Sequence, residues 1–406
     1  MRKSIVTFMS KRLLLFCSSL LVVFVASIAV DRLTGWLASS PEQGLIFPRN
    51  VTRHFQTPEF SFTTTTNSLG FRDRDFSQSK KVKTRIVALG DSFTYGWGVA
   101  AEESWPKVLE QRLRSSGLDV EIANLGKPGA SPRDYADIAD QSLPMLHPDV
   151  VIVGVLQGDD LAQMDATPPL ISALVQRHEN PNAISRHDRL RRIAGWLYPN
   201  FLRVVDNQAA ASAAALTNEW QQQAQLLTKV FTTEENARLD KLDPQVKDAF
   251  RLGELNPSLI YLGVHSPDYF LQTMDLNSAK TQDQISKMSE QLVRIRLAAN
   301  QINAKVIVVS VPYGIYVSPA SLASRHRLGF AVAPEMLTTN PEDDAIRNAS
   351  QRAGVDFYEF TDQFRRASTQ QQFFYLLDGH FNRAGHASFA EALTPVVSKT
   401  LARPIN

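Results

Sequence analysis

From Thr84 onward, short apolar runs alternate with helical patterns, and this alternation constrains the fold more than any other feature of the chain. The run Val150–Leu156 is continuous and largely β-branched, which is typical of strands buried on both faces of a parallel sheet. The predicted strands are Arg85–Leu89, Val120–Ala123, Val150–Leu156, Val306–Val311 and Val355–Tyr358, and the predicted helices are Trp105–Ser115, Ser131–Leu146, Gln282–Gln301, Ala345–Ala353 and Ala384–Val397. Such an order predicts an α/β protein, a three-layer α/β/α sandwich around a parallel sheet.

The alternation stops after the third predicted strand and resumes at the helix Gln282–Gln301. Between them, residues 161–278 are mostly helical by pattern and rich in alanine and glutamine around Gln208–Lys229. A connection of this length is too long for a loop, so we predict a mostly helical insertion within a domain that spans residues 84–406. Because connections after this strand leave the sheet at its ligand-binding edge, we expect the insertion to cover the site or to dock a partner.

An uncharged apolar run occupies residues 13–30. As a helix it would be about 27 Å long, close to the thickness of a bilayer core. Four cations and no acid precede it, which by the positive-inside rule keeps residues 1–12 in the cytoplasm and exports the rest. We predict a retained single-pass anchor in a bacterial inner membrane with a periplasmic catalytic domain. Signal cleavage near Ser27-Ile28-Ala29, followed by secretion, is the alternative.

Residues 31–83 are polar and interrupted by proline, with an extended run of threonines at Thr63–Thr66. Turn signals follow at Asn67–Gly70. We predict a tether and a few flanking strands laid on the main domain. The charge alternation Arg72-Asp73-Arg74-Asp75 predicts a solvated face.

Composition excludes several classes of function. The net charge of the 406 residues is +2 and becomes about −2 without the four N-terminal cations, so no basic surface predicts nucleic-acid binding. The single cysteine, Cys17, rules out a disulfide within the chain. No Walker loop, Gly-x-Gly-x-x-Gly motif or Cys/His cluster occurs, so we predict neither a cofactor nor a metal site. The absence of Gly-x-Ser-x-Gly disfavours the α/β-hydrolase fold.

Polar residues follow the carboxyl ends of four predicted strands. These are Gly90-Asp91-Ser92 after the first strand, Asn124, Gly126 and Gly129 after the second, Gly158-Asp159-Asp160 after the third, and Asp378 and His380 after the fifth. The carboxyl ends of parallel strands meet at one edge of the sheet, so we expect these residues to lie together. A serine, a histidine and an aspartate are the parts of an activated nucleophile, which indicates hydrolysis or transfer of an acyl group.

This ordered set resembles the SGNH (GDSL-type) hydrolase family, over residues 84–160 and 304–400. The resemblance implies the SGNH hydrolase fold with its flavodoxin-like sheet. It makes Ser92 the nucleophile, His380 its general base and Asp378 the acid that orients the imidazole. Many members place this acid three residues before the histidine, whereas here it lies two before. Some polysaccharide O-acetyltransferase relatives share the shorter spacing.

The resemblance also implies an oxyanion hole made by the amides of Ser92 and Gly126 and by a side chain after the third strand. Family members have an asparagine there, and this chain has Asp159. An ionised carboxylate would repel the oxyanion, so Asp159 is protonated and donates, Gln157 replaces it, or turnover is slow or lost. We expect the first, because burial and the neighbouring Asp160 raise a carboxyl pKa.

These observations predict an extracytoplasmic serine esterase that hydrolyses acetyl or other acyl esters through an acyl-enzyme. The predicted partners are the membrane, through residues 13–30, and an acylated small molecule, lipid or cell-envelope glycan as substrate. Two alternatives stay open: an O-acetyltransferase acting on cell-envelope polysaccharide, and a non-catalytic glycan-binding envelope protein.

Overall fold

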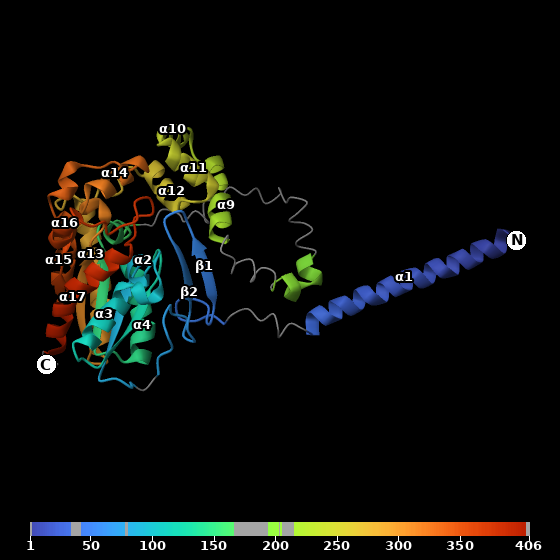
Figure 1. Cartoon of the computed structure of the whole chain (residues 1–406), viewed down its shortest axis with the longest axis horizontal. Helices are drawn as coiled ribbons and strands as arrows, with labels where there is room; N and C mark the ends of the chain where they lie inside the picture. The colour runs from blue at the N-terminus through green and yellow to red at the C-terminus, as the bar shows by residue number, and fades with distance from the viewer. Residues whose placement is uncertain are drawn as a thin grey trace. The chain divides into compact units, whose positions relative to one another are not determined.

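The computed structural model describes residues 2–33, 42–77, 80–165, 194–202, 204 and 215–402. The chain divides into two compact units, one of residues 1–41 with 179–212 and one of residues 42–178 with 213–406 (Figure 1). The second unit contains the sheet and every site residue predicted from the sequence.

The smaller unit consists of helix α1, Arg2–Leu33, and a short helical segment at residues 194–202. Within α1, residues Leu15–Leu33 are long and apolar enough to cross a membrane, a property shared with signal sequences. The Asp31 carboxylate accepts the N–H of Phe201 at 2.8 Å, so the helical segment lies against the C-terminal end of α1. The apolar run at residues 13–30 is helical as predicted, and Ser27 Oγ within it lies 2.7 Å from the hydroxyl of Tyr198, a residue of the predicted insertion.

Five parallel strands form the main sheet, in the order β4-β3-β5-β6-β7. Their bounds are β3 Thr84–Gly90, β4 Val120–Gly126, β5 Val150–Leu156, β6 Lys305–Val311 and β7 Asp356–Tyr358. The strand that comes first in the chain lies between the second and the third, which is the flavodoxin-like order. The five predicted strands and the predicted topology are confirmed.

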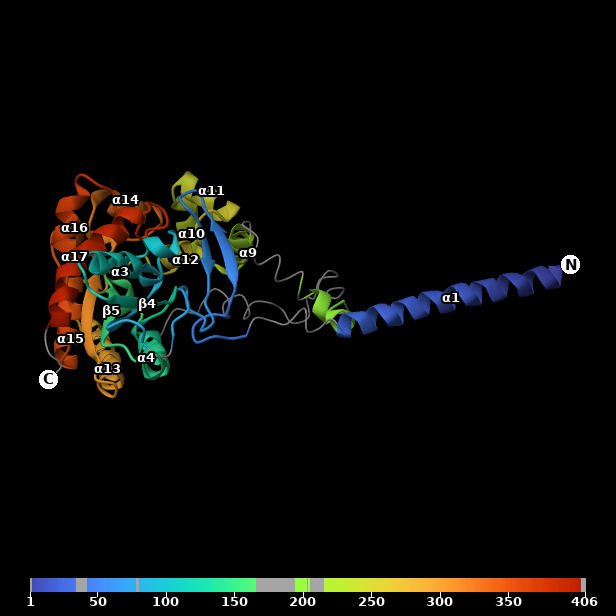
Figure 2. The same ribbon diagram turned by 60° about the horizontal axis from the view of Figure 1, so that its bottom comes forward.

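Helices cover both faces of this sheet (Figure 2). They are α3 Trp105–Ser115 and α17 Arg383–Ala402 on one face, and α4 Pro132–Leu146, α13 Ala279–Asn300 and α15 Pro341–Ala353 on the other. Side chains alternate along a strand, so Ile86 and Ile152 pack into the first core while Val87 and Val151 pack into the second. The predicted three-layer sandwich is confirmed.

Four helices make up most of the described part of the predicted insertion. They are α9 Ala215–Val230, α10 Thr233–Lys241, α11 Pro244–Leu252 and α12 Pro257–His265. Apolar side chains of all four, among them Leu227 and Ile260, join the core on the α3 side of the sheet. The helical character is confirmed over these residues, the predicted bounds 161–278 stay a prediction, and residues 166–193 and 205–214 lie outside the described residues.

Shorter helices connect the main elements. They are α2 Ser92–Tyr95, α5 Asp159–Ala162, α14 Pro319–Arg327 and α16 Thr361–Ser368, with 3-10 turns η2 Ala101–Glu103, η3 Gly314–Tyr316 and η4 Pro334–Leu337. Both α2 and α5 begin directly after a strand, and so they carry residues at the carboxyl edge of the sheet.

An antiparallel hairpin, β1 Thr52–Gln56 and β2 Ser61–Thr65, precedes the sheet in the chain. Its Phe55 and Phe60 pack against Trp97, with ring centroids 5.1 and 6.2 Å away. Phe60 also packs on Tyr375 at 5.1 Å. Aromatic contacts therefore fix this hairpin on the main domain, and the strands expected in residues 31–83 are present.

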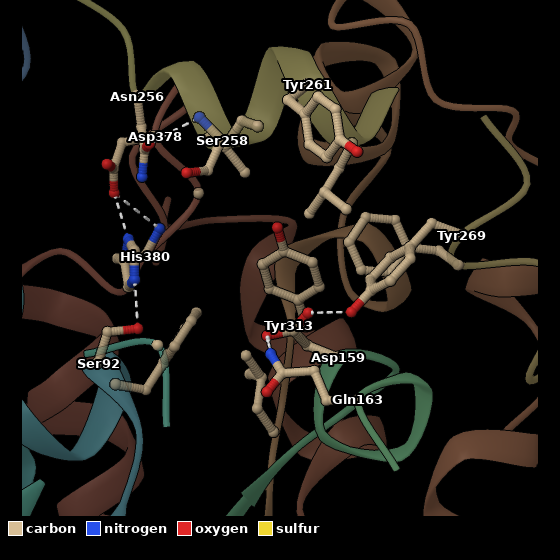
Figure 3. A pocket seen from close by; sticks show the side chains of 17 residues that line it. Ser92, Asp159, Gln163, Asn256, Ser258, Tyr261, Tyr269, Tyr313, Asp378 and His380 are labelled. Atoms are coloured by element: carbon tan, nitrogen blue, oxygen red, sulfur yellow. Dashed lines mark hydrogen bonds and ion pairs between the residues drawn. The ribbon is translucent and has the colours of Figure 1, made fainter. Parts of the chain in front are cut away.

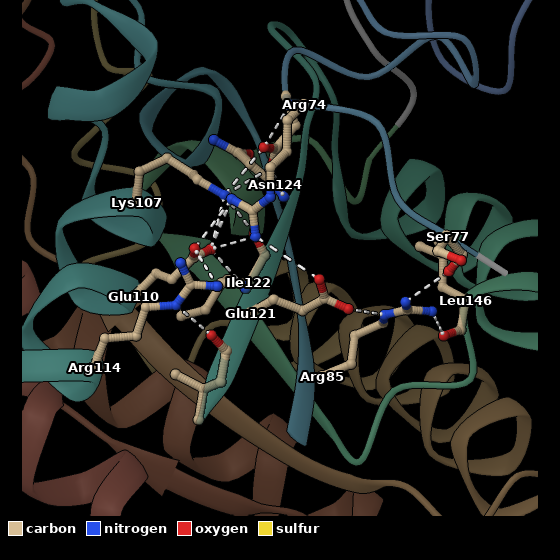
Figure 4. A network of polar contacts seen from close by, with 12 residues as sticks. Arg74, Ser77, Arg85, Lys107, Glu110, Arg114, Glu121, Ile122, Asn124 and Leu146 are labelled. Carbon is tan, nitrogen blue, oxygen red and sulfur yellow. Dashed lines mark hydrogen bonds and ion pairs between the residues drawn. The ribbon is translucent and has the colours of Figure 1, made fainter. Parts of the chain in front are cut away.

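Charged side chains join the chain after the hairpin to helix α3 and connect strand β3 with β4 (Figure 4). Arg74 pairs with Glu110 at 3.0 Å. The buried Arg85 pairs with Glu121 at 2.6 Å. Buried charges are tolerated when they are paired and hydrogen-bonded in this way.

The solvated face predicted at residues 72–75 is wrong for two of the four residues. Arg72 is 2% exposed and donates hydrogen bonds of 2.6–2.9 Å to three main-chain carbonyls within residues 95–99. The buried Asp73 pairs with Lys107 at 3.0 Å. Charge alternation within the segment carries no information about such partners, which come from other elements.

Candidate active site

Ser92 stands at the turn from β3 into α2. A Cβ on Gly90 would lie 2.0 Å from Thr94 Oγ1, so only glycine lets the first turn of α2 approach the strand this closely. Asp91 is the N-cap, and its carboxylate accepts the N–H of Phe93 at 2.9 Å. The sequence Gly90-Asp91-Ser92 thereby places the serine hydroxyl at the carboxyl edge of the sheet.

The structure brings Ser92, His380 and Asp378 into one hydrogen-bonded chain (Figure 3). His380 Nε2 lies 2.6 Å from Ser92 Oγ, and His380 Nδ1 lies 2.5 Å from Asp378 Oδ1. Burial raises the pKa of Asp378, but the charge and hydrogen bonds of His380 outweigh burial and bring it below its ordinary value. An ionised carboxylate on Nδ1 leaves Nε2 available as a base toward the serine.

Arg325 holds the turn that carries Asp378. The buried guanidinium donates to the carbonyl of Leu377 at 2.9 Å and to that of Asp378 at 2.7 Å. Gly379 has φ +92°, and a Cβ there would lie 1.3 Å from Arg325 Nη2. The glycine between the acid and the imidazole is therefore required both by the backbone and by the arginine beneath it.

A cavity of about 280 Å³ opens beside Ser92 (Figure 3). We call it the Ser92 cavity, and its lining residues are Ser92, Phe93, Gly129, Leu156, Asp159, Gln163, Asn256, Ser258, Leu259, Tyr261, Leu262, Tyr269, Phe270, Tyr313, Asp378, Gly379 and His380. The sequence predicted four of these as site residues. The contribution of α12 was not predicted, because helical periodicity shows that a helix exists but not what it covers.

Gly126 does not line the Ser92 cavity. It pairs with Gly90 in the sheet, and its N–H donates to Asn124 Oδ1 at 3.0 Å. Gly129, three residues later, lines the cavity with φ +72°. Within the described part of the chain, the N–H groups of Ser92 and Gly129 have no hydrogen-bond acceptor. Gly129 therefore lies at the cavity, whereas Gly126 lies within the sheet.

Asp159 lines the cavity, and both of its carboxyl oxygens are engaged. Oδ1 accepts the hydroxyl of Tyr269 at 2.7 Å, and Oδ2 accepts the amide of Gln163 at 2.8 Å. Burial raises the pKa of Asp159, and the Tyr269 hydrogen bond and the His380 charge counter only part of the rise. The direction agrees with the expectation of a readily protonated carboxyl group.

Gln157, the predicted substitute for Asp159, is not available as a donor to a substrate. It is buried, and its amide donates to Asp343 Oδ1 at 2.8 Å and to Thr361 Oγ1 at 2.6 Å. Its carbonyl oxygen accepts the N–H of Tyr313 at 2.9 Å. These contacts from three separate elements lock the side chain below the edge of the sheet, which the sequence alone does not show.

Two further carboxyl groups lie beneath the site. Burial raises the pKa of Asp91 to about 7, with the charge of His380 opposing the rise and that of Asp159 adding to it. Burial likewise raises the pKa of Asp160, which accepts the Tyr135 hydroxyl at 2.9 Å. Interacting carboxyl groups favour protonation of at least one of them near neutral pH. Among the described residues, no cluster of three or more His, Cys, Asp or Glu side chains could hold a metal ion.

Residues 88–244 match the model of the GDSL-like Lipase/Acylhydrolase family. An arylesterase of Vibrio mimicus is 28% identical over 85 residues, 21% of this chain and 42% of that protein, so the match spans less than half of this curated relative. Among solved structures, TesA matches with a TM-score of 0.38 at 10% identity, covering 78% of this chain and 98% of the other. The psychrotrophic esterase EstA from Pseudoalteromonas sp. matches with a TM-score of 0.37 at 10% identity, covering 79% and 100%.

Proposed function

We propose that this chain, whose residues 88–244 match the GDSL-like Lipase/Acylhydrolase family model, is a serine esterase that cleaves carboxylic esters at Ser92. The observation that carries the proposal is the unbroken hydrogen-bond chain from Asp378 through His380 to Ser92. A serine hydroxyl is unreactive at neutral pH unless a base removes its proton during attack, and His380 lies within reach to do so.

In the first half of the reaction, Ser92 Oγ bonds to the ester carbonyl carbon while its proton moves to His380 Nε2. The carbon–oxygen bond of the ester then breaks, and the departing alcohol takes that proton. In the second half, water attacks the acyl-enzyme, gives a proton to His380 and releases the acid as Oγ regains a proton. The Asp378 carboxylate stays ionised and stabilises the imidazolium in both halves.

The developing oxyanion needs donors placed in advance of the reaction. The free N–H groups of Ser92 and Gly129 fit this role, and we assign it to them in place of Gly126. A protonated Asp159 is the third donor in this proposal, since its pKa is raised and it faces the same cavity. Gln163 holds Asp159 in position through its amide.

The proposed location of the catalytic domain is inferred from helix α1. Its Leu15–Leu33 stretch is long enough to span a bilayer, and the four cations before the apolar run favour a cytoplasmic N-terminus. The catalytic domain would then act outside the cytoplasm, tethered to the membrane. A reporter fused after residue 406 that is active only when exported would support this orientation, and activity only in the cytoplasm would refute it.

The test is p-nitrophenyl ester hydrolysis by the full chain in detergent, comparing the native protein with Ser92→Ala. The exposed Ser116 lies outside the cavity, and Ser116→Ala serves as the matched control. Activity lost only in Ser92→Ala supports the esterase. Release of p-nitrophenol that requires an added sugar and yields an acylated sugar would favour the O-acetyltransferase. A folded protein with no Ser92-dependent reaction would favour the non-catalytic glycan-binding protein.

A further inference from the structure

Helix α12 forms one wall of the Ser92 cavity. Leu259 and Leu262 lie one turn apart on the same face of this helix, and both line the cavity together with Tyr261. Asn256 caps the helix by accepting the N–H of Ser258 at 3.0 Å, so the start of α12 is fixed beside the cavity. Helix α12, which belongs to the predicted helical insertion, thus determines the shape of the space next to Ser92.

The lining of this space is mostly apolar, and its polar side chains besides the reacting groups are uncharged amides and hydroxyls, such as those of Gln163, Asn256 and Ser258. No lysine or arginine is among its lining residues. Of its acids, Asp378 is engaged by His380, and Asp159 by Tyr269 and Gln163. The remaining surface is mostly leucine, phenylalanine and tyrosine, such as Leu156. A neutral apolar group fits such a lining, and an anionic group finds no cation there.

The volume of the cavity exceeds what an acetyl group fills. The whole cavity, including the side beside His380, has a volume of about 280 Å³, several times the roughly 30 Å³ that one water occupies in the liquid. An acetyl group contributes only its carbonyl and one methyl. An acyl chain of about four to eight carbons would fill the space far better.

The positions of the polar groups indicate which half of the ester lies in this space. Figure 3 shows His380 and Asp378 on one side of the cavity, with Tyr261, Tyr269 and Tyr313 on the other. The departing alcohol must lie near His380 Nε2 to receive its proton. The acyl group then extends in the opposite direction, toward the tyrosines and α12.

We propose that the Ser92 cavity is an acyl pocket walled by α12, which selects neutral apolar acyl groups of about four to eight carbons. This inference rests on the proposed esterase function. It assigns to the helical insertion the role of setting substrate length.

Ethyl hexanoate and hexyl acetate test the proposal because they are isomers that place the six-carbon chain on opposite sides of the ester. The native full chain should hydrolyse ethyl hexanoate about tenfold faster or more, measured as kcat/KM. Leu262→Trp fills the pocket and should abolish this preference. Leu252→Trp is the matched control, since Leu252 is exposed on α11 and lies outside the cavity.

Equal rates for the two isomers, faster cleavage of hexyl acetate, or an unchanged preference in Leu262→Trp would overturn the acyl pocket. Failure of the esterase itself would look different. In that case neither ester would be cleaved and a fluorophosphonate probe would not label Ser92.

A second inference rests on an independent observation, the contacts of Glu59. This residue lies in the turn between β1 and β2, more than three hundred residues before Asp378. Its carboxylate accepts the N–H of Asp378 at 2.7 Å and that of Leu377 at 3.0 Å. One acid of the hairpin therefore holds the main chain of the turn that carries Asp378.

Arg325 holds the same two residues through their carbonyl groups, since its guanidinium donates a hydrogen bond to each. The hairpin that carries Glu59 is itself fixed, because Phe60 packs on Trp97 and Tyr375. Charge-assisted hydrogen bonds are stronger than neutral ones and fix geometry well. Both the N–H groups and the carbonyl groups of this turn are therefore fixed by hydrogen bonds to side chains of other elements.

We propose that Glu59 is a positioning residue that holds Asp378 in register with His380. It touches neither the substrate nor the reacting atoms, and it acts through the main chain of residues 377–378. This inference also rests on the proposed esterase function, and it gives the N-terminal hairpin a role in the reaction.

The test compares Glu59→Ala, Glu59→Gln and a hairpin control, Gln56→Ala, whose side chain is exposed. Glu59→Ala should lower kcat about tenfold to a hundredfold with KM within about twofold, because misplacement of a catalytic group costs rate rather than binding. Glu59→Gln keeps an acceptor oxygen and should recover much of the rate. Amide hydrogen exchange at residues 377 and 378 should rise in Glu59→Ala, a readout that needs no activity.

Native kcat in Glu59→Ala, or unchanged exchange at residues 377 and 378, would overturn the positioning role. A rise in KM equal to the loss in kcat/KM would do the same. An inactive native protein that nevertheless shows the exchange difference would contradict the esterase and leave the structural part of the inference standing.

Discussion

The N-terminal segment, residues 42–77, and the helical cover α9–α12 are both additions to the same parallel sheet, and they reach the site in different ways. The N-terminal segment contacts main-chain groups: Arg72 donates to carbonyls after Ser92, and Glu59 accepts the N–H groups beside Asp378. The helical cover instead presents side chains to the cavity from α12. Changes in the first region should therefore affect all substrates alike, whereas changes in the second should alter the choice among substrates.

The largest loss of activity is expected at Gly379, which lies in the turn that Glu59 of the N-terminal segment holds. In Gly379→Ala the new Cβ would overlap the Arg325 guanidinium, and the alanine would have to adopt φ +92°. We expect kcat/KM to fall about a hundredfold or more for every ester, since the turn that carries Asp378 must move. The comparison is with Gly117→Ala, which has a similar φ of +86° but open space around the new Cβ. Equal losses in the two variants, measured on folded protein, would show that backbone strain and not the turn is responsible.

The next largest effect is expected for substitution of Arg72, and it is a loss of free energy of unfolding. Arg72→Met leaves three carbonyls within residues 95–99 without their donor, which should lower the free energy of unfolding by about 3 kcal/mol. Urea denaturation followed by tryptophan fluorescence measures it. Arg53→Met, an exposed position on β1, should stay within about 0.5 kcal/mol of the native protein. Similar losses of unfolding free energy at both positions would show that Arg72 does not specifically fix the turn after Ser92.

Asp159 lines the Ser92 cavity, and the effect of replacing it on the rate should depend on pH. Burial raises the pKa of Asp159, so the protonated form persists to a higher pH than for an exposed aspartate. If that form donates to the oxyanion, native activity falls as pH rises through the raised pKa, and Asp159→Asn removes the fall. At the alkaline end of a profile from about pH 5 to 9, we expect Asp159→Asn to be about tenfold more active than the native protein. An identical profile in both proteins would contradict the donor role.

Tyr269 should give the smallest effect. Its hydroxyl hydrogen bond lowers the pKa of Asp159, so Tyr269→Phe should raise that pKa further and move the alkaline limb of the rate profile to higher pH. The ring stays in the cavity, and the preference between isomeric esters should therefore be unchanged. A shift of the limb to lower pH would reverse the assigned role of the hydrogen bond.

The sheet and the meeting of Ser92, His380 and Asp378 at its edge could be predicted, because both depend on local patterns. Strand β5 is an apolar run with the bounds predicted for it, and Ser92 follows β3 directly in the sequence. The sheet then brings His380 to Ser92, as expected for residues at one edge.

The glycine that lines the cavity was harder to predict, because its position depends on where a strand ends. The apolar pattern placed the end of the second strand at Ala123, but β4 continues to Gly126, which pairs with Gly90. The turn begins three residues later than the pattern indicates, and this shift brings Gly129 into the cavity. The Pro128-Gly129 pair is the signal that could have located the turn.

The contacts of Glu59, Arg72 and α12 could not be predicted, since each depends on a partner far away in the sequence. Glu59 meets Leu377 and Asp378 across more than three hundred residues. A single sequence gives periodicity and turn signals but not the packing of one element on another, and both inferences drawn from the structure depend on such packing.

The proposed function depends on the activation of Ser92 by His380 toward an ester. Labelling by an alkyl fluorophosphonate, followed by mass spectrometry of the peptides, tests it most directly, with His380→Ala and Ser116→Ala compared with the native full chain. We expect the probe to attach to Ser92, His380→Ala to slow labelling about a hundredfold or more, and Ser116→Ala to leave the rate unchanged. A label on another residue, or labelling of Ser92 at the native rate without His380, would show that His380 does not activate Ser92.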